Sequence, residues 1–340
     1  MKFVCKDCFA DKELIGFIES QNIFGDCDVC SNKAIEIIDI DETLEFFSEL
    51  MLNFSLKDGE KDLFSQIQEN WDFFREPKTG IEILNEVLSR IHSEISSANA
   101  TVTFNEEVLD NINYWTIFKE KLIWETRYVS NIEYLTEDLG WDSFFESKVK
   151  IGEGDIFYRG RLHHNANEDI FGPNEMYAPP REDSVAGRAN PEGIPFLYLS
   201  DNESTVLYEV RGSFLDEISI GKFVPLSSME DPIIISDFTE TPALFYPGEV
   251  NKRIKSTLLK KQISIDLSRP MRRYDSELDY IPTQFICEFI KVFTNVQGIK
   301  FKSSVHEGGN NIVIFDESIM ECTSVKKVKV SEVRIQSEDL

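Results

Sequence analysis

The feature that most constrains this chain is the clustering of its cysteines, because four of the six lie within the first 30 residues. Cys5 and Cys8 form one C-x2-C pair and Cys27 and Cys30 form a second, with 18 residues between the pairs. This spacing is typical of a four-cysteine ribbon, in which two short turns converge on one tetrahedral zinc ion. The metal replaces the hydrophobic core that so short a segment cannot supply. The sequence therefore predicts a structural zinc domain over residues 1–40.

Three other interpretations of this segment are weaker. A pair of disulfides is disfavoured in a cytoplasmic protein, and a four-thiolate metal has no open position for a substrate. Four lysines against eight acidic residues in the first 40 also argue against a ribbon that reads DNA. Cys287 and Cys322 stand far apart in the sequence, and we expect each to be a small buried hydrophobe rather than a nucleophile.

The stretch from Asp41 to about Asn131 has helical periodicity, with breaks at Asp58-Gly59 and Pro77–Gly80. It predicts a bundle of roughly four helices within a domain over residues 41–148. The aromatic stripe of this segment is interpreted as core and not as a cofactor site. The positions that recur on one helical face are Leu44, Phe47, Met51 and Phe54, then Leu84, Leu88, Ile91 and Ile95, then Trp115, Phe118 and Leu122.

After about Gly152 the pattern changes to short β-type runs, which indicate an α+β domain over residues 149–340. One short helix is predicted near 202–211 and a longer one over Ser276–Thr294. The chain has no glycine-rich Rossmann fingerprint and no P-loop, so a dinucleotide would not be bound in the manner of a dehydrogenase. The predicted strands are 156–162, 194–199, 221–226, 232–238, 298–301, 311–315 and 325–335.

Charge narrows the function classes. The net charge of −26 argues against a general affinity for nucleic acid, which needs clustered lysine and arginine. No apolar run approaches the roughly 20 residues that span a bilayer, and Lys6, Asp7 and Asp11 interrupt any signal peptide. We therefore expect a cytoplasmic protein that binds neither nucleic acid nor membrane. Between residues 151 and 221 there are five arginines and no lysine, a bias that suits bidentate recognition of a phosphate or carboxylate. Salt bridging within a very acidic protein is the alternative interpretation.

One segment of this region carries a candidate site. Arg188, Tyr198 and Glu209 follow one another at intervals of ten and eleven residues, across a predicted loop, strand and helix. An arginine can hold a pyrophosphate, a tyrosine can stack on a flat ring, and a carboxylate can stabilise a cationic sugar. Together these side chains point to chemistry on NAD.

Several blocks in order make the C-terminal half resemble the RES family, named for its Arg, Glu and Ser, over about residues 150–320. They are Phe157-Tyr158-Arg159, Tyr177-Ala178-Pro179-Pro180, Gly187-Arg188-Ala189-Asn190-Pro191, Leu197-Tyr198-Leu199, Ser204 to Val210, Tyr280-Ile281-Pro282-Thr283-Gln284, Gly298 to Ser304, and Gly308 to Phe315. The resemblance implies a fold similar to the ADP-ribosyltransferase toxins and an NAD-degrading bacterial toxin, usually neutralised by an antitoxin partner. The front half also looks like a helical HEPN-type domain, although it lacks the arginine and histidine signature of the HEPN ribonucleases.

The resemblance also assigns site residues. The catalytic set that it implies is Arg188, Tyr198, Glu209 and Ser303, with Ser304 as the alternative serine; the residues implied to bind NAD are Arg159, Tyr177, Asn190 and Ser304. Glu209 would stabilise an oxocarbenium-like state while the nicotinamide–ribose bond breaks. Tyr198 would stack on or flank the nicotinamide, the arginines would hold the pyrophosphate, and Ser303 would bond the nicotinamide ribose or amide.

Three functions follow as alternatives. The first is cleavage of NAD with water or phosphate as the acceptor, and the second is ADP-ribosylation of a specific protein. The third is a silent interaction module in which the zinc ribbon and the bundle carry the function. The sequence leaves open the acceptor, the existence of an antitoxin and whether the chain forms an oligomer.

Overall fold

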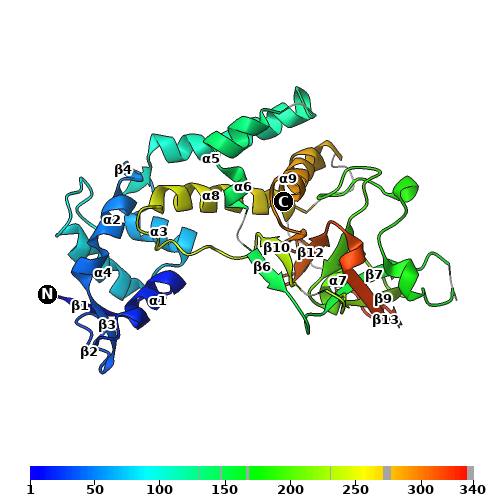
Figure 1. Ribbon diagram of the computed structural model, residues 1–340, viewed down its shortest axis with the longest axis horizontal. Helices are drawn as coiled ribbons and strands as arrows, with labels where there is room; N and C mark the ends of the chain where they lie inside the picture. Colours follow the sequence, from blue (N-terminus) through cyan, green and yellow to red (C-terminus); the bar gives the residue numbers. More distant parts are fainter. Residues whose placement is uncertain (129, 146–147, 166–167, 230, 271–276, 335–340) are drawn as a thin grey trace. The chain divides into compact units, whose positions relative to one another are not determined.

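The computed structural model describes the chain from Met1 to Arg334 except residues 129, 146–147, 166–167, 230 and 271–276; residues 335–340 also lie outside the described residues (Figure 1). The chain divides into two compact units. Met1–Ile117 and Thr241–Leu259 form the first unit, and Phe118–Glu240 and Lys260–Leu340 form the second. The three-domain division inferred from the sequence stays a prediction.

The N-terminal part of the first unit is built around a small antiparallel sheet of order β1-β3-β2. Its strands are β1 (Phe3–Cys5), β2 (Phe24–Gly25) and β3 (Ile35–Asp39), and helix α1 (Lys12–Ser20) lies between the first two in sequence. Asp11 caps α1 by accepting the backbone N–H groups of Glu13 and Leu14 at 3.1 and 3.0 Å. Cys5 ends β1, and the second cysteine pair lies between β2 and β3. The sheet therefore brings the two pairs, which are separate in sequence, close together in space.

The helical segment up to Ile112 packs around an aromatic core, as its periodicity predicts, whereas Phe118 belongs to the second unit and packs against Trp141 and Phe285 there. Its elements are α2 (Leu44–Met51), β4 (Phe54–Leu56), α3 (Leu63–Trp71), α4 (Pro77–Leu88), β5 (Val102–Phe104) and α5 (Glu106–Trp124). Phe46 and Phe73 are fully buried and stack with their ring centroids 5.6 Å apart. The short β4–β5 pair was not predicted, because three-residue strands leave too few positions to show alternation.

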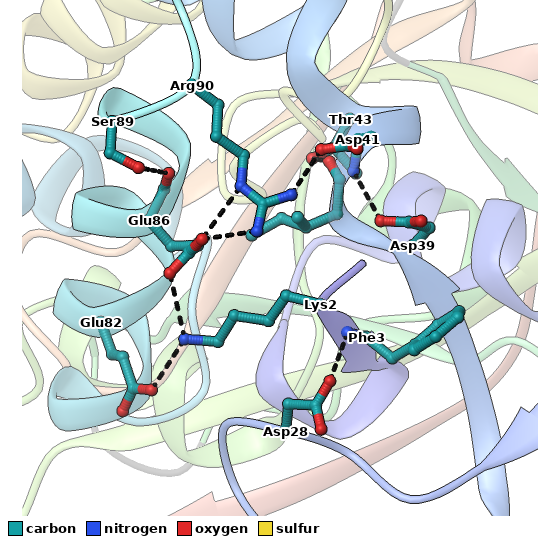
Figure 2. Close-up of polar contacts among 11 residues, drawn as sticks. Lys2, Phe3, Asp28, Asp39, Asp41, Thr43, Glu82, Glu86, Ser89 and Arg90 are labelled. Atoms are coloured by element: carbon teal, nitrogen blue, oxygen red, sulfur yellow. Dashed lines mark hydrogen bonds and ion pairs between the residues drawn. The ribbon is translucent and has the colours of Figure 1, made fainter.

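An ion-pair network joins β1 to the neighbouring helix in this unit (Figure 2). Lys2 Nζ lies 3.1 Å from a carboxylate oxygen of Glu82 and 3.3 Å from one of Glu86. Arg90 bridges Glu86 and Asp41 at 2.5 and 2.6 Å. Hydrogen bonding to Arg90, the larger cause, and to Lys2 lowers the pKa of the Glu86 carboxyl. Each exposed pair contributes little alone, so the network matters chiefly as a connection between β1 and α4.

The second unit contains the large sheet. Its order is β13-β9-β7-β8-β12-β11-β10-β6, and it is mixed because β10 and β11 run parallel while the other neighbours run antiparallel (Figure 1). The strands are β6 (Lys148–Ile151), β7 (Phe157–Leu162), β8 (Leu197–Ser200), β9 (Glu217–Pro225), β10 (Ile233–Asp237), β11 (Gly298–Lys302), β12 (Asn310–Ile314) and β13 (Met320–Lys329). Its α+β class with a mixed sheet confirms the prediction.

The remaining helices show where the sequence pattern was incompletely interpreted. The predicted helices correspond to α7 (Glu203–Glu209) and α9 (Ile281–Phe293), while the expected start at Ser276 lies outside the described residues. The short α6 (Trp141–Phe144) and the long α8 (Val250–Leu267) were not predicted. The α8 pattern is nevertheless present, since the buried Val250, Ile254 and Leu258 recur at intervals of four. Among the described helices, none is long and apolar enough to cross a membrane.

Candidate functional site

Neighbouring strands β7, β8 and β12 contribute residues to one cavity of about 340 Å³ in the second unit. This volume falls within the usual range for small-molecule sites, roughly 300–1,000 Å³. The cavity is lined by Tyr158, Arg159, Gly160, Arg188, Tyr198, Leu199, Ser200, Val206, Glu209, Val210, Arg211, Tyr280, Phe301, Ser304, Val305 and Asn311. Of the predicted set, Arg188, Tyr198, Glu209, Arg159 and Ser304 lie on this wall.

Helix α7 positions Glu209 at its last residue. Asn202 caps the other end, because its side-chain oxygen accepts the Thr205 N–H at 2.9 Å. The helix packs closely on β7 because Gly160 has no side chain; a Cβ there would lie 2.5 Å from a methyl group of Val206. Oε1 of Glu209 accepts two hydrogen bonds, from the Ser303 hydroxyl at 2.7 Å and from the Asn311 side-chain amide at 2.6 Å.

Arg188 is fixed by two acceptors from distant parts of the second unit. Its guanidinium donates to the Leu267 carbonyl at 2.8 Å and to the Ser304 hydroxyl at 3.1 Å. Burial lowers the pKa of Arg188, and the nearby Glu209 carboxylate opposes that shift. An arginine stays charged under such shifts at neutral pH, so Arg188 brings a positive charge beside the glutamate.

Arg159 on β7 brings a second charge. Its Nη1 lies 3.4 Å from the Tyr198 carbonyl, and its buried Nε has no hydrogen-bond partner among the described residues. Burial, with a smaller contribution from the like charge of Arg161, lowers the pKa of Arg159 to about 10. A buried cationic donor without a hydrogen-bond partner is energetically costly, and an anionic ligand would satisfy it.

Tyr198 is held by the loop that precedes it. Its hydroxyl donates to the Asn190 side chain at 2.8 Å and accepts the Ala189 N–H at 3.0 Å. Gln284 ties the same loop to α9 by donating to the carbonyls of Gly187 and Asn190 at 2.8 and 3.0 Å. Burial raises the pKa of Tyr198, so its hydroxyl is neutral. Asn190 is buried and supports the tyrosine without lining the cavity itself.

Two predicted residues take other places. The Tyr177 hydroxyl donates to the Met320 carbonyl at 3.2 Å and accepts the Cys322 N–H at 3.1 Å, so it joins β13 and does not line the cavity. The Ser303 hydroxyl donates a hydrogen bond to Glu209 and accepts one from the His306 N–H at 3.2 Å. The two candidate serines therefore have separate contacts, Ser303 with the glutamate and Ser304 with the arginine.

The cavity wall includes residues to which the sequence assigned no role, among them Asn311, Ser200 and Tyr280. A signal existed for Asn311, because an amide at an interior strand position of a buried sheet needs a polar partner. Arg211 is one of the five arginines between residues 151 and 221, so composition carried a signal for its charge, whereas its backbone conformation left no signal in the sequence. Its φ of 52° is left-handed, and it directly follows Val210, the residue after the last of α7.

The cysteine cluster of the first unit is a candidate metal centre. The sulfur atoms of Cys5 and Cys8 are 3.8 Å apart, those of Cys5 and Cys30 3.4 Å, and those of Cys8 and Cys27 3.7 Å. A disulfide would bring two sulfurs to about 2 Å. A tetrahedral ion with metal–sulfur bonds of about 2.3 Å would separate them by about 3.8 Å. The four thiols are therefore free and arranged so that they could hold one metal ion.

The other two cysteines are buried, as expected. Cys287 is 0% exposed and Cys322 is 7% exposed, and burial raises the pKa of both thiols. A thiol with a raised pKa is a poor nucleophile, which agrees with their interpretation as small hydrophobic residues.

Comparisons with known proteins identify the family. A family model described as the RES domain matches residues 157–336, more than half of the chain and all of the cavity wall. No curated protein matches the chain, and no solved structure matches it either. The match includes β7, β8, α7 and β12, the elements that carry the arginines, tyrosine, glutamate and asparagine described above. The chain therefore belongs to the RES family.

Proposed function

We propose that this chain consumes NAD by breaking its nicotinamide–ribose bond. The observation that carries the proposal is the Glu209 carboxylate on a cavity wall that also contains Arg159, Arg188 and Arg211, within a RES domain. One carboxylate among three guanidinium groups is the charge pattern expected for a dianionic pyrophosphate joined to a sugar that becomes cationic.

The arginines supply the binding part of this function. The chain has a net charge of −26, so its general field repels an anionic dinucleotide. The guanidinium groups of Arg159 and Arg188, which are already partly desolvated, offset this repulsion where the pyrophosphate would lie. Arg159 would gain the partner that its buried Nε lacks among the described residues, and Arg188 is held in place by Leu267 and Ser304 before the ligand arrives.

Glu209 supplies the electrostatic part of the catalysis. The bond between ribose C1′ and the nicotinamide nitrogen breaks, and its electron pair leaves with neutral nicotinamide. The ribose becomes oxocarbenium-like, and the Glu209 carboxylate stabilises this charge while accepting the 2′-hydroxyl hydrogen bond. Water then adds at C1′ and loses its proton to solvent, which gives ADP-ribose. With phosphate as the acceptor, phosphate adds at the same carbon, which is numbered C1″ in ADP-ribose, and the product is ADP-ribose 1″-phosphate.

Tyr198 and the serine pair position the substrate. The Tyr198 hydroxyl is engaged by Asn190 and Ala189, so the aromatic ring is the part available to flank nicotinamide. Ser303 acts through Glu209 and Ser304 acts through Arg188, a refinement of the direct ligand contacts expected of both. The resemblance to ADP-ribosyltransferase folds stays a prediction beside this assignment.

For the front of the chain we propose a structural zinc ion on Cys5, Cys8, Cys27 and Cys30, because four thiolates at these separations suit that metal. Such a site folds its surroundings and takes no part in the chemistry. The toxic role in a bacterial cytoplasm, the antitoxin partner and the HEPN-like character of the helical segment are further parts of the same proposal.

The test measures NAD during brief expression and with purified protein, for the wild type, Glu209→Gln and Glu192→Gln. Glu192 is an exposed control that does not line the cavity. Loss of the preorganised carboxylate is expected to slow NAD cleavage by about 10²-fold or more, while Glu192→Gln matches the wild type. Free ADP-ribose or its 1″-phosphate identifies the acceptor. Radiolabel transferred to one protein would instead establish ADP-ribosylation, and stable NAD with all three proteins would refute cleavage and leave the interaction module.

A further inference from the structure

We propose that Asn311 and Ser200 form a hydrogen-bond relay that orients Glu209, so that Asn311 is a positioning residue of the site. The inference deepens the function proposed above and rests on it for its kinetic test. The relay runs from the Ser200 hydroxyl to Asn311 Oδ1 at 2.9 Å, and from Asn311 Nδ2 to Glu209 Oε1 at 2.6 Å.

The direction of each bond in the relay follows from the carboxylate. An ionised Glu209 can only accept, so the Asn311 atom that faces it must be the amide nitrogen. The amide oxygen then faces Ser200, whose hydroxyl must donate. Ser200 and Asn311 are paired in register across β8 and β12 and are 4% and 7% exposed. Because both side chains are largely buried, removing either one leaves a buried polar group of the other without its hydrogen-bond partner.

Glu209 needs such a partner because its place in the fold does not fix it. The residue is exposed and ends α7, where the helix dipole disfavours a negative charge. Both of its hydrogen bonds go to Oε1, and Oε2 accepts none from the described residues. The two donors therefore hold the carboxylate in one orientation and leave Oε2 for a ligand in the cavity.

The two donors differ in how firmly they are held. Ser303 follows β11 in the connection to β12, where its hydroxyl also accepts the Val305 and His306 N–H groups at 3.3 and 3.2 Å. Asn311 lies within β12, between β8 and β11 in the sheet. The strand supplies the fixed reference, so Asn311 sets the orientation of the carboxylate even when a ligand displaces the serine connection.

The kinetic test compares Asn311→Ala, Asn311→Asp and Ser200→Ala with the wild type. The control is Asn310→Ala, because the Asn310 amide bonds to Asp201 and not to Glu209. Asn311→Ala is expected to lower kcat for NAD cleavage by roughly 10- to 100-fold with KM changed less than about threefold. Ser200→Ala keeps the Asn311 side-chain amide but removes the hydrogen bond that fixes its rotamer. We therefore expect about a threefold to tenfold loss of kcat.

Asn311→Asp sharpens the test because it keeps the shape of the side chain but replaces the donating amide nitrogen with a carboxylate oxygen that accepts hydrogen bonds. Two carboxylates facing each other disfavour simultaneous ionisation, so the acidic limb of the kcat–pH profile is expected to move to higher pH. An unchanged kcat and pH profile in both Asn311 variants would refute the relay. A rise in KM at constant kcat would also refute it, since Asn311 would then contact the substrate directly.

A double-mutant cycle and a structure separate positioning from folding. If Asn311 acts through Glu209, Asn311→Ala adds little further loss in the Glu209→Gln background; an undiminished second loss overturns the relay. A crystal structure of Asn311→Ala gives a readout without NAD, and we expect the Glu209 carboxylate to leave its wild-type position or to occupy several. An unmoved carboxylate overturns the relay. If the wild type does not cleave NAD but the Glu209 carboxylate is displaced in Asn311→Ala, the proposed NAD cleavage is refuted and the relay is not.

Discussion

Gly187 shows how the absence of one side chain places a functional one. A Cβ at this position would lie 2.7 Å from the Asn190 side-chain oxygen and 2.8 Å from the Tyr198 hydroxyl. These two atoms bond to each other, so any added group displaces the contact that fixes the tyrosine. The need for glycine here comes from space, since its backbone is not left-handed.

Gly187→Ala is therefore expected to destabilise the second unit by about 1–3 kcal/mol through overpacking. It should also slow NAD cleavage by at least about tenfold, because an ångström-scale shift of a positioned group is costly. Thermal unfolding and steady-state kinetics measure the two effects. Gly152→Ala is the matched control, because a Cβ there meets nothing within 4 Å. Equal behaviour of the two variants would contradict the assigned role of Gly187.

Lys260 is a buried charge outside the cavity, and it links stability to pH. It is 4% exposed, and burial lowers its pKa to about 8 despite the opposing charges of Asp237 and Glu240. Its ammonium donates to the Asp237 carbonyl, while Lys300 pairs with the Asp237 carboxylate at 3.3 Å. The folded state therefore releases this proton at lower pH than the unfolded chain, whose lysine titrates near 10.4.

Because the unfolded state binds more protons between these two values, Lys260 makes stability rise from about pH 8 to about pH 10.4. The rise is at most about 3 kcal/mol. Urea unfolding of the wild type and Lys260→Met across this range isolates the contribution, which should be missing from the variant. Lys302→Met replaces an exposed lysine and should keep the wild-type slope. A wild-type slope in Lys260→Met would show that the buried ammonium is not its source.

At the scale of elements, α7 links the N-terminal cap at Asn202 to the position of the Glu209 carboxylate at its C-terminal end. Asn202 accepts both the N–H and the hydroxyl of Thr205, and Glu209 is the last residue of the helix. A helix of seven residues has little stability of its own, so its cap and its packing on β7 carry much of its order.

Asn202→Ala is expected to destabilise α7 by about 1 kcal/mol, whereas Asn202→Asp keeps an oxygen acceptor and should stay near the wild type. Hydrogen exchange of the α7 amides measures the local loss, and kcat reports whether fraying reaches Glu209. If the alanine variant exchanges no faster than the aspartate variant, the cap does not stabilise this helix.

At the scale of the whole molecule, the two units depend on different kinds of stabilisation. Both units have buried aromatic clusters, but the first also has a cluster of four thiols, whereas the second has the large mixed sheet. Positive charge gathers on the cavity wall of a chain whose net charge is −26. The proposed metal therefore supports folding in one unit, while the proposed chemistry belongs entirely to the other.

Purified protein is expected to contain about one zinc ion per chain, and Cys27→Ser should lose it because a tetrahedral site needs all four ligands. The variant should show a lower melting temperature and faster proteolysis within the first unit. Metal analysis with melting curves makes the comparison. Cys322→Ser changes a buried cysteine outside the cluster and should retain the metal. Full zinc content in Cys27→Ser would mean that other ligands hold the ion.

Where the signal is local, the sequence by itself determined much of this protein. The two C-x2-C pairs, the change from helical to strand periodicity, and the order of Arg159, Arg188, Tyr198 and Glu209 are all local patterns. They predicted the cysteine cluster, the α+β class with a mixed sheet, the family and five residues of the cavity wall. Periodicity and motif spacing carry such information because they depend on residues a few positions apart.

Only the tertiary structure decided which distant groups hold those residues in place. Asn311 meets Glu209 across 102 positions, and the Leu267 carbonyl meets Arg188 across 79. Contacts between distant residues also explain why Tyr177 does not line the cavity. Its hydroxyl forms hydrogen bonds with β13, more than 140 positions away. Partners at such separations are chosen by strand order and packing, which no local pattern encodes, so the motifs identified the reacting groups and the fold determined their orientation.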